Sequence, residues 1–362
     1  MLFIHHITGI KSDSLWVGGH SNTGKQILKQ VDSSGNVMKT INDAFCEYGS
    51  FAITQNGELL YLEVGNTKVQ KKTPDGTTTI ITTSGENIKC IFSSQITGDI
   101  LVGVYIARSS AGKLTRYDKT GAKIQDIQVY KQGQALYSNP TYIAENKNGD
   151  IVTADSSKHK VVLVDRSGEY RGDYKGQSPN KREFDPHGVC TDVHGHIIVV
   201  DYTSGSIHLL DQDLKFLTLL LTKTKEDLKS AKGLCVDEKH NLYVGSENGR
   251  INVYKYLKDV CFVCDAIARA GWVVWSGRRE RRKDIGEEGR IYESSIIRSC
   301  RAGSNCDCLT GFNFLRTVIR LKTMILPCER TVPSNCTKQT FPITTTAHGG
   351  CDQRSAEDAR SF

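Results

Sequence analysis

Short apolar runs alternate with polar turns along the first two thirds of the chain, and one pattern of runs occurs twice between Pro140 and Leu221. The first copy reads PTYIAENKNGDIVTADSSKHKVVLVDRSGEYRGDY, and the second reads PHGVCTDVHGHIIVVDYTSGSIHLLDQDLKFLTLL. In both copies the runs are rich in Val, Ile and Tyr, and Asn, Gly, Asp and Ser separate them. This pattern predicts four short antiparallel strands joined by tight turns in each copy.

The same unit recurs six times. The first apolar residue of each second run provides the anchors, which are Leu15, Leu59, Ile100, Ile151, Ile197 and Leu242. The intervals between them are 44, 41, 51, 46 and 45 residues, so the copies fill residues 1–256. Four antiparallel strands per repeat are the unit of a β-propeller blade, and the chain is therefore predicted to be an all-β, six-bladed β-propeller. The sixth copy shows only three clear strands, and Leu2–His5 and Val260–Val263 are both candidates for its fourth.

Small residues recur seven positions before four of the anchors, at Ala52, Ala144, Cys190 and Cys235. They predict the innermost strands, where the blades converge and leave little room. Aspartates end the second and third runs of both copies in the Pro140–Leu221 stretch, at Asp155, Asp165, Asp201 and Asp211. Because Asp155 and Asp201 recur at equivalent places, we expect them to hold adjacent loops by hydrogen bonds rather than to form one active site, whereas Asp165 begins an Asp-x-x-Gly turn. The cysteines before residue 257, which are Cys46, Cys90, Cys190 and Cys235, are predicted to be buried small apolar residues without disulfides.

The composition changes near residue 257. Residues 1–256 hold 30 basic and 28 acidic residues, whereas residues 257–362 hold 17 and 12. Lysine dominates before the boundary and arginine after it, and eight of the twelve cysteines follow it. We therefore predict a propeller at residues 1–257 and a low-order, Arg- and Cys-rich tail at residues 258–362. Neither a signal peptide nor a membrane-spanning run is recognisable, so a cytoplasmic protein without membrane contact is expected.

The six copies resemble NHL repeats. The stretches GQALYSNPTYIAENKNGDIVTAD, PHGVCTDVHGHIIVVD, FLTLLLTK and LYVGSENGRINVYKYL resemble, more closely, the propeller of tripartite-motif (TRIM) proteins. In that family a RING finger, a B-box and a coiled coil precede the propeller and carry the ubiquitin-ligase activity, and these 362 residues contain none of the three. The resemblance implies a non-catalytic recognition module, tied to ubiquitination, that binds a protein substrate or single-stranded RNA through one propeller face.

The loops after second strands and before first strands gather on one face of a propeller. Basic groups with an aromatic residue at this face suit phosphates and stacked bases of single-stranded RNA. The candidate ligand-binding residues there are Lys68, Arg108, Lys158, His159, Lys181, Arg182, His187, Tyr202, Lys232 and Arg250. The alternative is a solvated loop surface in a Lys-rich protein. The near balance of charge in residues 1–256 argues against strong non-specific binding of nucleic acid.

Two motifs with other chemistry fail on inspection. Gly19–Gln26 nearly spells a phosphate-binding loop, but Gln26 stands where Ser or Thr should hold magnesium, and a strand pattern follows instead of a helix. A polar hairpin loop is the better interpretation. The pair Cys261 and Cys264 has no second CxxC partner at zinc-site spacing, although Cys300, Cys306 and Cys308 follow. We therefore predict no metal and no cofactor.

Two other functions remain as alternatives to a recognition module. Six-bladed propellers include calcium-dependent esterases or lactonases, which gather carboxylate and amide oxygens at the channel mouth. Glu63, Asn66 and Asn139 are the candidates for such oxygens here, and nothing aligns them. A purely structural scaffold is the other alternative. The absence of a recognisable catalytic set favours recognition over enzymatic activity.

Overall fold

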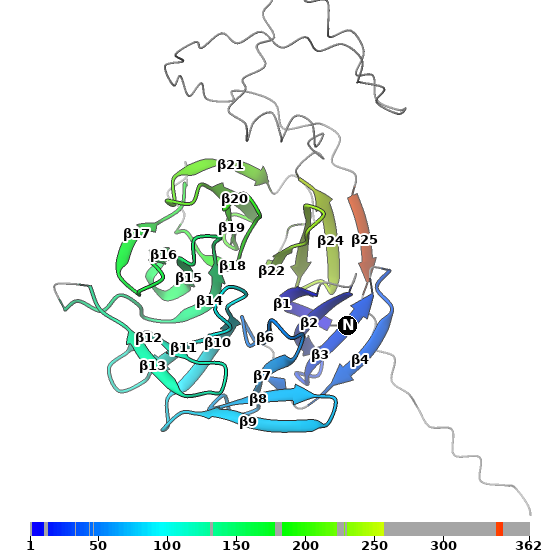
Figure 1. Cartoon of the computed structure of the whole chain (residues 1–362). Helices are drawn as coiled ribbons and strands as arrows, with labels where there is room; N and C mark the ends of the chain where they lie inside the picture. Colours follow the sequence, from blue (N-terminus) through cyan, green and yellow to red (C-terminus); the bar gives the residue numbers. More distant parts are fainter. Residues whose placement is uncertain are drawn as a thin grey trace, which may run out of the picture. The chain divides into compact units, whose positions relative to one another are not determined.

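The computed structural model describes residues 2–10, 14–32, 34–42, 44–45, 47–130, 133–177, 183–222, 228, 230–256 and 338–342. Their strands form five four-stranded sheets and one five-stranded sheet. Figure 1 shows the sheets arranged around a common centre, with consecutive sheets side by side. The chain is a six-bladed β-propeller, as the repeat predicts.

Blades one, three, four and five are each built from four consecutive antiparallel strands. Blade one contains β1 (Leu2–Ile10), β2 (Ser14–Ser21), β3 (Gln26–Asp32) and β4 (Val37–Ile41). Blade three contains β10 (Asn87–Ser93), β11 (Ile100–Ile106), β12 (Ala111–Tyr117) and β13 (Lys123–Ile127). Blade four contains β14 (Pro140–Glu145), β15 (Ile151–Asp155), β16 (Lys160–Val164) and β17 (Tyr170–Tyr174), with the short 3-10 helix η1 (Ser156–Lys158) between its middle strands. Blade five contains β18 (Pro186–Thr191), β19 (Ile197–Asp201), β20 (Ser206–Leu210) and β21 (Phe216–Leu221).

Blade two has an interrupted first strand. It contains β5 (Ala44–Phe45), β6 (Phe51–Ile53), β7 (Leu59–Glu63), β8 (Lys68–Thr73) and β9 (Gly76–Thr82). Both β5 and β6 pair with β7, so the innermost strand is interrupted between them, where the structure describes residues 47–50 as an insertion. This insertion is the irregularity on which the candidate site depends.

Blade six takes its outer strand from far along the chain. Its inner strands are β22 (Ala231–Val236), β23 (Asn241–Ser246) and β24 (Arg250–Lys255). Its fourth strand is β25 (Lys338–Pro342), which pairs antiparallel with β24 from Arg250↔Pro342 to Tyr254↔Lys338 (Figure 1, orange-red beside yellow-green).

Neither of the two expected segments completes the last blade. Leu2–His5 lies within β1, which pairs with β2 and is the first strand of blade one. Because the first repeat already uses the N-terminal strand, that strand is not available to the sixth. Val260–Val263 lies outside the described residues. Residues 338–342 cover the edge of β24, which would otherwise offer unpaired backbone groups.

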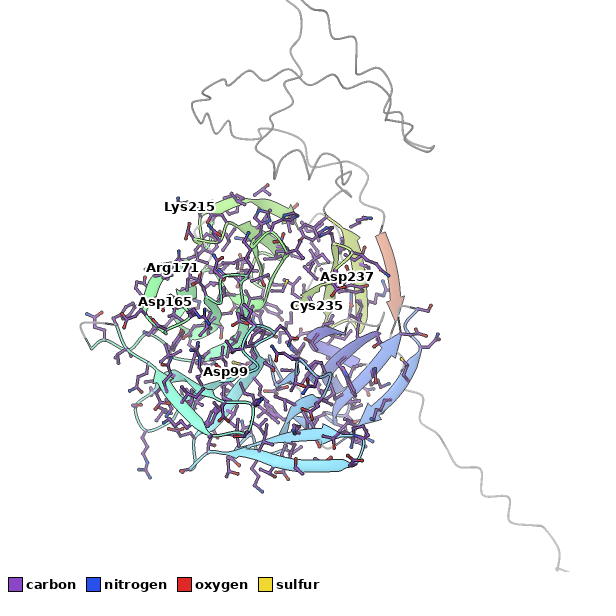
Figure 2. All side chains as sticks on the ribbon, viewed as in Figure 1. Asp99, Asp165, Arg171, Lys215, Cys235 and Asp237 are labelled. Carbon is purple, nitrogen blue, oxygen red and sulfur yellow. The ribbon has the colours of Figure 1, made fainter. Side chains whose placement is uncertain are left out.

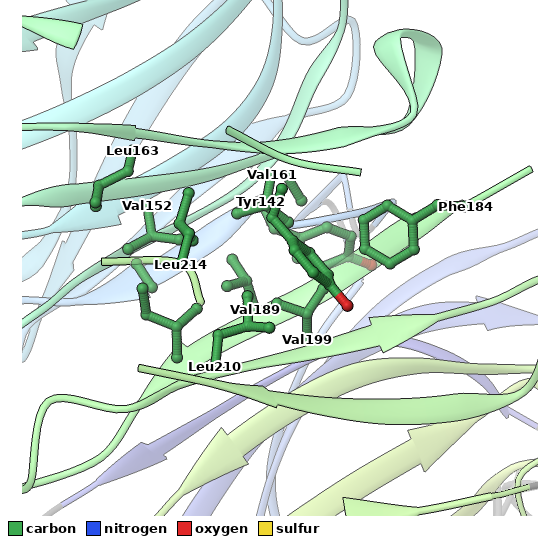
Figure 3. Packing of buried hydrophobic residues seen from close by; sticks show 13 residues of the cluster. Tyr142, Val152, Val161, Leu163, Phe184, Val189, Val199, Leu210 and Leu214 are labelled. Atoms are coloured by element: carbon green, nitrogen blue, oxygen red, sulfur yellow. The ribbon is translucent and has the colours of Figure 1, made fainter. Parts of the chain in front are cut away.

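Six apolar clusters join neighbouring blades. The cluster between blades four and five includes Tyr142, Val152, Phe184 and Val199, all nearly inaccessible to solvent (Figure 3). The ring is closed in the same way, since residues of β1 and β2 pack against Cys235 and Ile251 of blade six. Burying each large apolar side chain stabilises the fold by about 1.5–3 kcal/mol. Contacts between blades, rather than a strand shared between first and last blade, therefore hold the ring together.

The predicted positions of small residues are confirmed. Ala52, Ala144, Cys190 and Cys235 all lie in the first strands of their blades. Cys90 also lies in a first strand, and the three described cysteines of the propeller are free thiols. Burial raises the pKa of Cys90, Cys190 and Cys235, as expected for small core residues. Cys46 lies outside the described residues.

The boundary after residue 257 stays a prediction, because most of residues 257–362 lie outside the described residues. So do the cysteines of that segment. In the part of the chain that the structure describes, no helix is long and apolar enough to cross a membrane.

Candidate binding site on the loop face

We call one side of the ring the loop face: it carries the loops that precede first strands and follow second strands. The opposite side, with the turns from first to second and from third to fourth strands, is the turn face. The loop face brings together side chains from blades one, two, four, five and six.

The insertion in blade two reaches across the centre of the ring. The N–H of Gly49 donates to the carbonyl of Thr141 in blade four at 3.0 Å, and its carbonyl accepts from Ile91 of blade three at 2.6 Å. Tyr48 precedes it with a φ of 52°, a left-handed conformation that is costly for a residue with a Cβ. These non-local hydrogen bonds hold Tyr48 in that conformation.

Tyr48 forms a floor of aromatic rings with Tyr142 and His187. The three ring centroids are 6.2–6.3 Å apart, and the Tyr48 and Tyr142 planes meet at 85°. Tyr142 is fully buried, and its hydroxyl donates to the carbonyl of His5 in blade one at 2.7 Å. The floor therefore links blades one, two, four and five.

The first strands of blades five and six approach closely beside this floor. A Cβ at Gly188 would lie 2.2 Å from the carbonyl oxygen of Lys232, so only glycine fits this position. His187 precedes Gly188 and lies near the start of β18, and Lys232 lies near the start of β22. The close approach therefore places both side chains at the same part of the loop face.

Tyr202 connects these two side chains. Its ring centroid lies 4.8 Å from that of His187 and 5.1 Å from the Lys232 Nζ. Its hydroxyl donates to the Glu247 carboxylate at 3.1 Å, and Lys232 Nζ lies 2.7 Å from the same carboxylate. The ammonium is thus engaged by a carboxylate and an aromatic face at once.

A pair of imidazoles lies deeper in blade one. His5 Nε2 and His20 Nδ1 are 2.9 Å apart, and His20 stacks on Phe3 with centroids 4.8 Å apart. Burial, followed by the positive charge of Lys232, lowers the pKa of His5 to about 3. His5 is therefore neutral at pH 7 and adds no positive charge to the site.

The carboxylates around the floor stay ionised. Burial alone would raise the pKa of Glu247, but the hydrogen bonds and charge of Lys232 hold it below the usual value. At Asp185 burial also raises the pKa, but the hydrogen bond and charge of His187 lower it below its usual value. The His187 Nε2 lies 3.4 Å from the Asp185 carboxylate. The described centre of the loop face therefore combines aromatic rings, neutral imidazole and carboxylates with one paired ammonium.

The structure brings together three of the ten residues predicted from the sequence, which are His187, Tyr202 and Lys232. Lys158 and His159 lie in the neighbouring loop of blade four, where Lys158 donates to the carbonyl of Ala135 and His159 Nδ1 lies 3.0 Å from that of Phe184. Both side chains bond within the protein.

The other predicted residues are separate. Lys68 Nζ lies 3.6 Å from the Glu63 carboxylate in blade two. Arg108 and Arg250 are exposed in blades three and six. Lys181 and Arg182 lie outside the described residues. Among the described residues, no contact joins Lys68, Arg108 or Arg250 to the aromatic floor, so the expected ring of basic groups is not assembled there.

The sequence analysis missed Tyr48, His5, His20 and Glu247. Tyr48 depends on an insertion that follows no repeat pattern, and His5 and His20 meet only through the pairing of β1 with β2. Glu247 carried a usable signal, because it follows the second strand of its blade, as Tyr202 does. Its carboxylate is not one of the basic groups that phosphate binding requires.

The structure also places the phosphate-loop motif and the candidate calcium ligands. The phosphate-loop look-alike is a hairpin between β2 and β3, in which Ser21 N–H donates to the carbonyl of Lys25. Of the calcium candidates, Glu63 accepts from Gln70, whereas the side-chain oxygen of Asn139 is buried without a hydrogen-bond partner among the described residues. In the described part of the chain, no group of three or more His, Cys, Asp or Glu side chains is arranged to hold a metal ion.

No protein-family model matches the chain, and no curated protein matches it. Solved structures with a similar fold include virginiamycin B lyase from Staphylococcus aureus, as a catalytically inactive variant with quinupristin (TM-score 0.52, 13% identity, 71% of this chain and 82% of that chain). A protein of unknown function from Bacteroides thetaiotaomicron is also similar (TM-score 0.54, 13% identity, 68% and 67%). So is a chain of a nidogen/laminin complex (TM-score 0.51, 11% identity, 64% and 83%). At these identities the likeness shows the fold alone.

Proposed function

We propose that the chain is a non-catalytic recognition module that binds a partner protein at the centre of the loop face. The observation that carries this proposal is the group formed by Tyr48, His187, Tyr202, Lys232 and Glu247, in which aromatic rings from blades two and five lie beside one ion pair of blade six. Aromatic residues with a polar atom at the edge are typical anchors of protein interfaces.

The balance of charge favours protein over RNA. Phosphate binding needs cations that are available to the ligand. Lys232 is paired with Glu247, and Lys158 is bonded to a backbone carbonyl. Asp185 and Glu47 add negative charge near Tyr48, where both raise the pKa of its hydroxyl after the larger effect of burial. A partner segment with basic and apolar side chains fits this surface better than a phosphodiester chain.

The relation to ubiquitination rests on the sequence resemblance to TRIM propellers. In such a system the chain supplies substrate recognition and another protein supplies the RING domain. We expect no ubiquitin transfer from this chain alone in an autoubiquitination assay with E1 and E2 enzymes. Transfer by the purified chain would contradict the proposal of a non-catalytic module.

The partner class is tested by selection from a random-peptide display library on the full chain, followed by calorimetry. We expect selected peptides to carry Lys or Arg beside apolar residues. Tyr202→Ala should weaken their binding by about 2 kcal/mol, as the loss of an aromatic anchor does. Tyr170→Ala on the outer strand of blade four is the matched control and should bind as the wild type does.

Two outcomes would overturn the choice of protein. A single-stranded, uridine-rich RNA that binds more tightly than every selected peptide, with loss on Tyr202→Ala, would favour RNA at the same surface. Equal binding of peptides by the wild type and Tyr202→Ala would remove the loop face as their site.

A second candidate function is catalysis at the loop face, such as the esterase activity considered above. Asp185 lies 3.4 Å from His187 Nε2, and His187 Nδ1 is buried without a hydrogen-bond partner among the described residues. A carboxylate beside an imidazole is an arrangement that general bases use. Hydrolysis of p-nitrophenyl acetate, with and without calcium, tests it. Activity that His187→Gln abolishes would replace recognition by catalysis.

A further inference from the structure

A second site lies on the turn face, between blades three and four. A cavity of about 140 Å³ is lined there by Ser94, Asp99, Arg116, Glu145, Gly149 and Arg166. These residues come from two blades: the turn after β10 and the end of β12 face the end of β14 and the turn after β16. Figure 2 labels Asp99 among the side chains of this region.

The guanidinium groups of Arg116 and Arg166 line the cavity, and each has hydrogen-bond donors without a partner among the described residues. Arg116 Nη1 donates to the carbonyl of Arg166 at 2.7 Å, but its Nε is buried without a hydrogen-bond partner and lies 4.0 Å from Asp99. No hydrogen bond or ion pair of the Arg166 guanidinium is found among the described residues. A buried donor without a partner is costly, so a ligand that accepts from it gains free energy. Arginine suits a carboxylate because its donors match the two oxygens.

Two carboxylates face the same space. Glu145 accepts the Ser94 hydroxyl at 2.8 and 3.0 Å through its two oxygens, which leaves further lone pairs on both. Burial raises the pKa of Glu145 despite that hydrogen bond. Asp99 also lines the cavity, and its carboxylate lies 4.0 Å from the Arg116 Nε. The cavity therefore presents acceptors for a cation as well as donors for an anion.

We infer that this cavity binds a small zwitterion of the α-amino acid class. Arg116 and Arg166 would receive its carboxylate, and Glu145 and Asp99 would receive its ammonium group. Opposite charges on one small molecule satisfy both sets of side chains and leave the net charge of the cavity unchanged. A simple anion would satisfy the arginines but would face two carboxylates.

The size of the cavity limits the ligand. The volume of about 140 Å³ is well above the roughly 10–15 Å³ that one water molecule needs, so a small organic molecule fits. That matches a backbone amino and carboxyl group with a very small side chain, as in glycine, alanine or serine.

Calorimetric titration of the full chain with glycine, L-alanine and L-serine tests the inference. Acetate, methylammonium and inorganic phosphate are the matched probes, each with only one sign of charge. We expect the amino acids to bind at least about ten-fold more tightly than any of the three, because each charge adds a charge-assisted hydrogen bond.

Two variants and one control locate the site. Arg166→Gln should weaken amino acid binding by about ten-fold, and the exposed position of Arg166 makes loss of folding unexpected. Glu145→Gln should weaken binding of the amino acids and strengthen that of acetate, because it removes one of the two carboxylates that an anion faces. Arg108→Gln, which removes an exposed arginine from the loop face, should bind as the wild type does.

Several results would overturn the inference. No heat of binding with any amino acid, equally tight binding of acetate or phosphate, or unchanged binding by Arg166→Gln would each do so. If Glu145→Gln does not fold, the Arg166→Gln titration decides the matter alone.

Discussion

The turn face of the propeller is held mainly by hydrogen bonds within each turn, whereas the loop face is held mainly by hydrogen bonds between residues far apart in the sequence. On the turn face, one aspartate in each of six turns accepts the N–H groups of the residues two and four positions later, at 2.8–3.0 Å. These aspartates are Asp32, Asp118, Asp165, Asp192, Asp211 and Asp237. Figure 2 labels Asp165, Asp237 and also Lys215, whose N–H donates to Asp211.

The loop face shows no such uniformity. Asp155 accepts from the backbone of Ser138 and Asn139, which belong to the preceding loop, as well as from Lys158. Tyr142 reaches His5 across the ring. Turns held by their own residues repeat around the ring, whereas the contact of an aspartate with the preceding loop is found at Asp155 and Asp201 of blades four and five and not at the equivalent positions of the other blades, which are not aspartates. From this difference we expect a specific binding site on the loop face, because its non-local contacts vary between blades.

Replacing an aspartate on each face gives the largest expected difference. Asp155→Ala leaves three backbone N–H groups of a fully buried site without their acceptor and should lower the free energy of unfolding by about 3 kcal/mol. Asp165→Ala opens a solvent-accessible turn and should cost about 1 kcal/mol. Urea unfolding at pH 7 measures both. Equal losses would mean that the two faces are not held differently.

Acid should destabilise the loop face through His5. Its pKa is about 3 in the fold against 6.5 when unfolded, so the unfolded chain binds the extra proton as the pH falls from 6.5. The free energy of unfolding should therefore drop by about 2 kcal/mol between pH 6.5 and pH 5 from this group. Urea unfolding of the wild type and His5→Gln across this range isolates the effect. Parallel pH profiles would contradict the assignment.

The hydroxyl of Tyr142 should matter by a smaller amount. Tyr142→Phe removes the donor to the buried carbonyl of His5 and keeps the ring, so we expect a loss of about 1 kcal/mol. Tyr105→Phe is the control, because no hydrogen bond of the Tyr105 hydroxyl is found in the described part of the chain. A loss in Tyr105→Phe as large as that in Tyr142→Phe would remove the case for a cross-ring contact.

The smallest effect is expected on the turn face, with the opposite sign from His5. The hydrogen bond to Asp192 raises the pKa of His196 above 6.5. The stabilisation is complete below pH 6.5 and is lost as the pH rises through the higher folded pKa. Because His196 is partly exposed, we expect less than about 1 kcal/mol. Thermal unfolding of the wild type should show this alkaline loss, and His196→Gln should not. A wild type without the loss would refute the ion pair.

The fold was predictable because its strands and turns follow from the order of residues close together in the sequence. The spacing of Leu59, Ile151 and Ile197, each preceded by a glycine two positions earlier, marks second strands that follow tight turns, and all three begin β-strands. The role of Asp155 and Asp201 as holders of loops is also confirmed by their hydrogen bonds. Local hydrogen bonds and the alternation of apolar residues suffice for this part.

The candidate site was only partly predictable. Tyr202 lies in a loop, and His187 and Lys232 lie near the starts of β18 and β22. The repeat reveals all three places, but their grouping depends on the close approach at Gly188. Tyr48 owes its position to hydrogen bonds of Gly49 with blades three and four, and β25 owes its partner to a pairing across more than eighty residues of sequence. Contacts between residues so far apart leave no periodic signal in the chain.

Photo-crosslinking tests the central claim most directly. A benzophenone amino acid is placed at position 202 on the loop face and, in a separate protein, at exposed position 124 on the outer strand of blade three. Each is irradiated with an equimolar mixture of a selected basic peptide and a uridine-rich RNA. The account predicts a peptide adduct from position 202 and none from position 124. An RNA adduct from position 202, or equal peptide adducts from both positions, would contradict it.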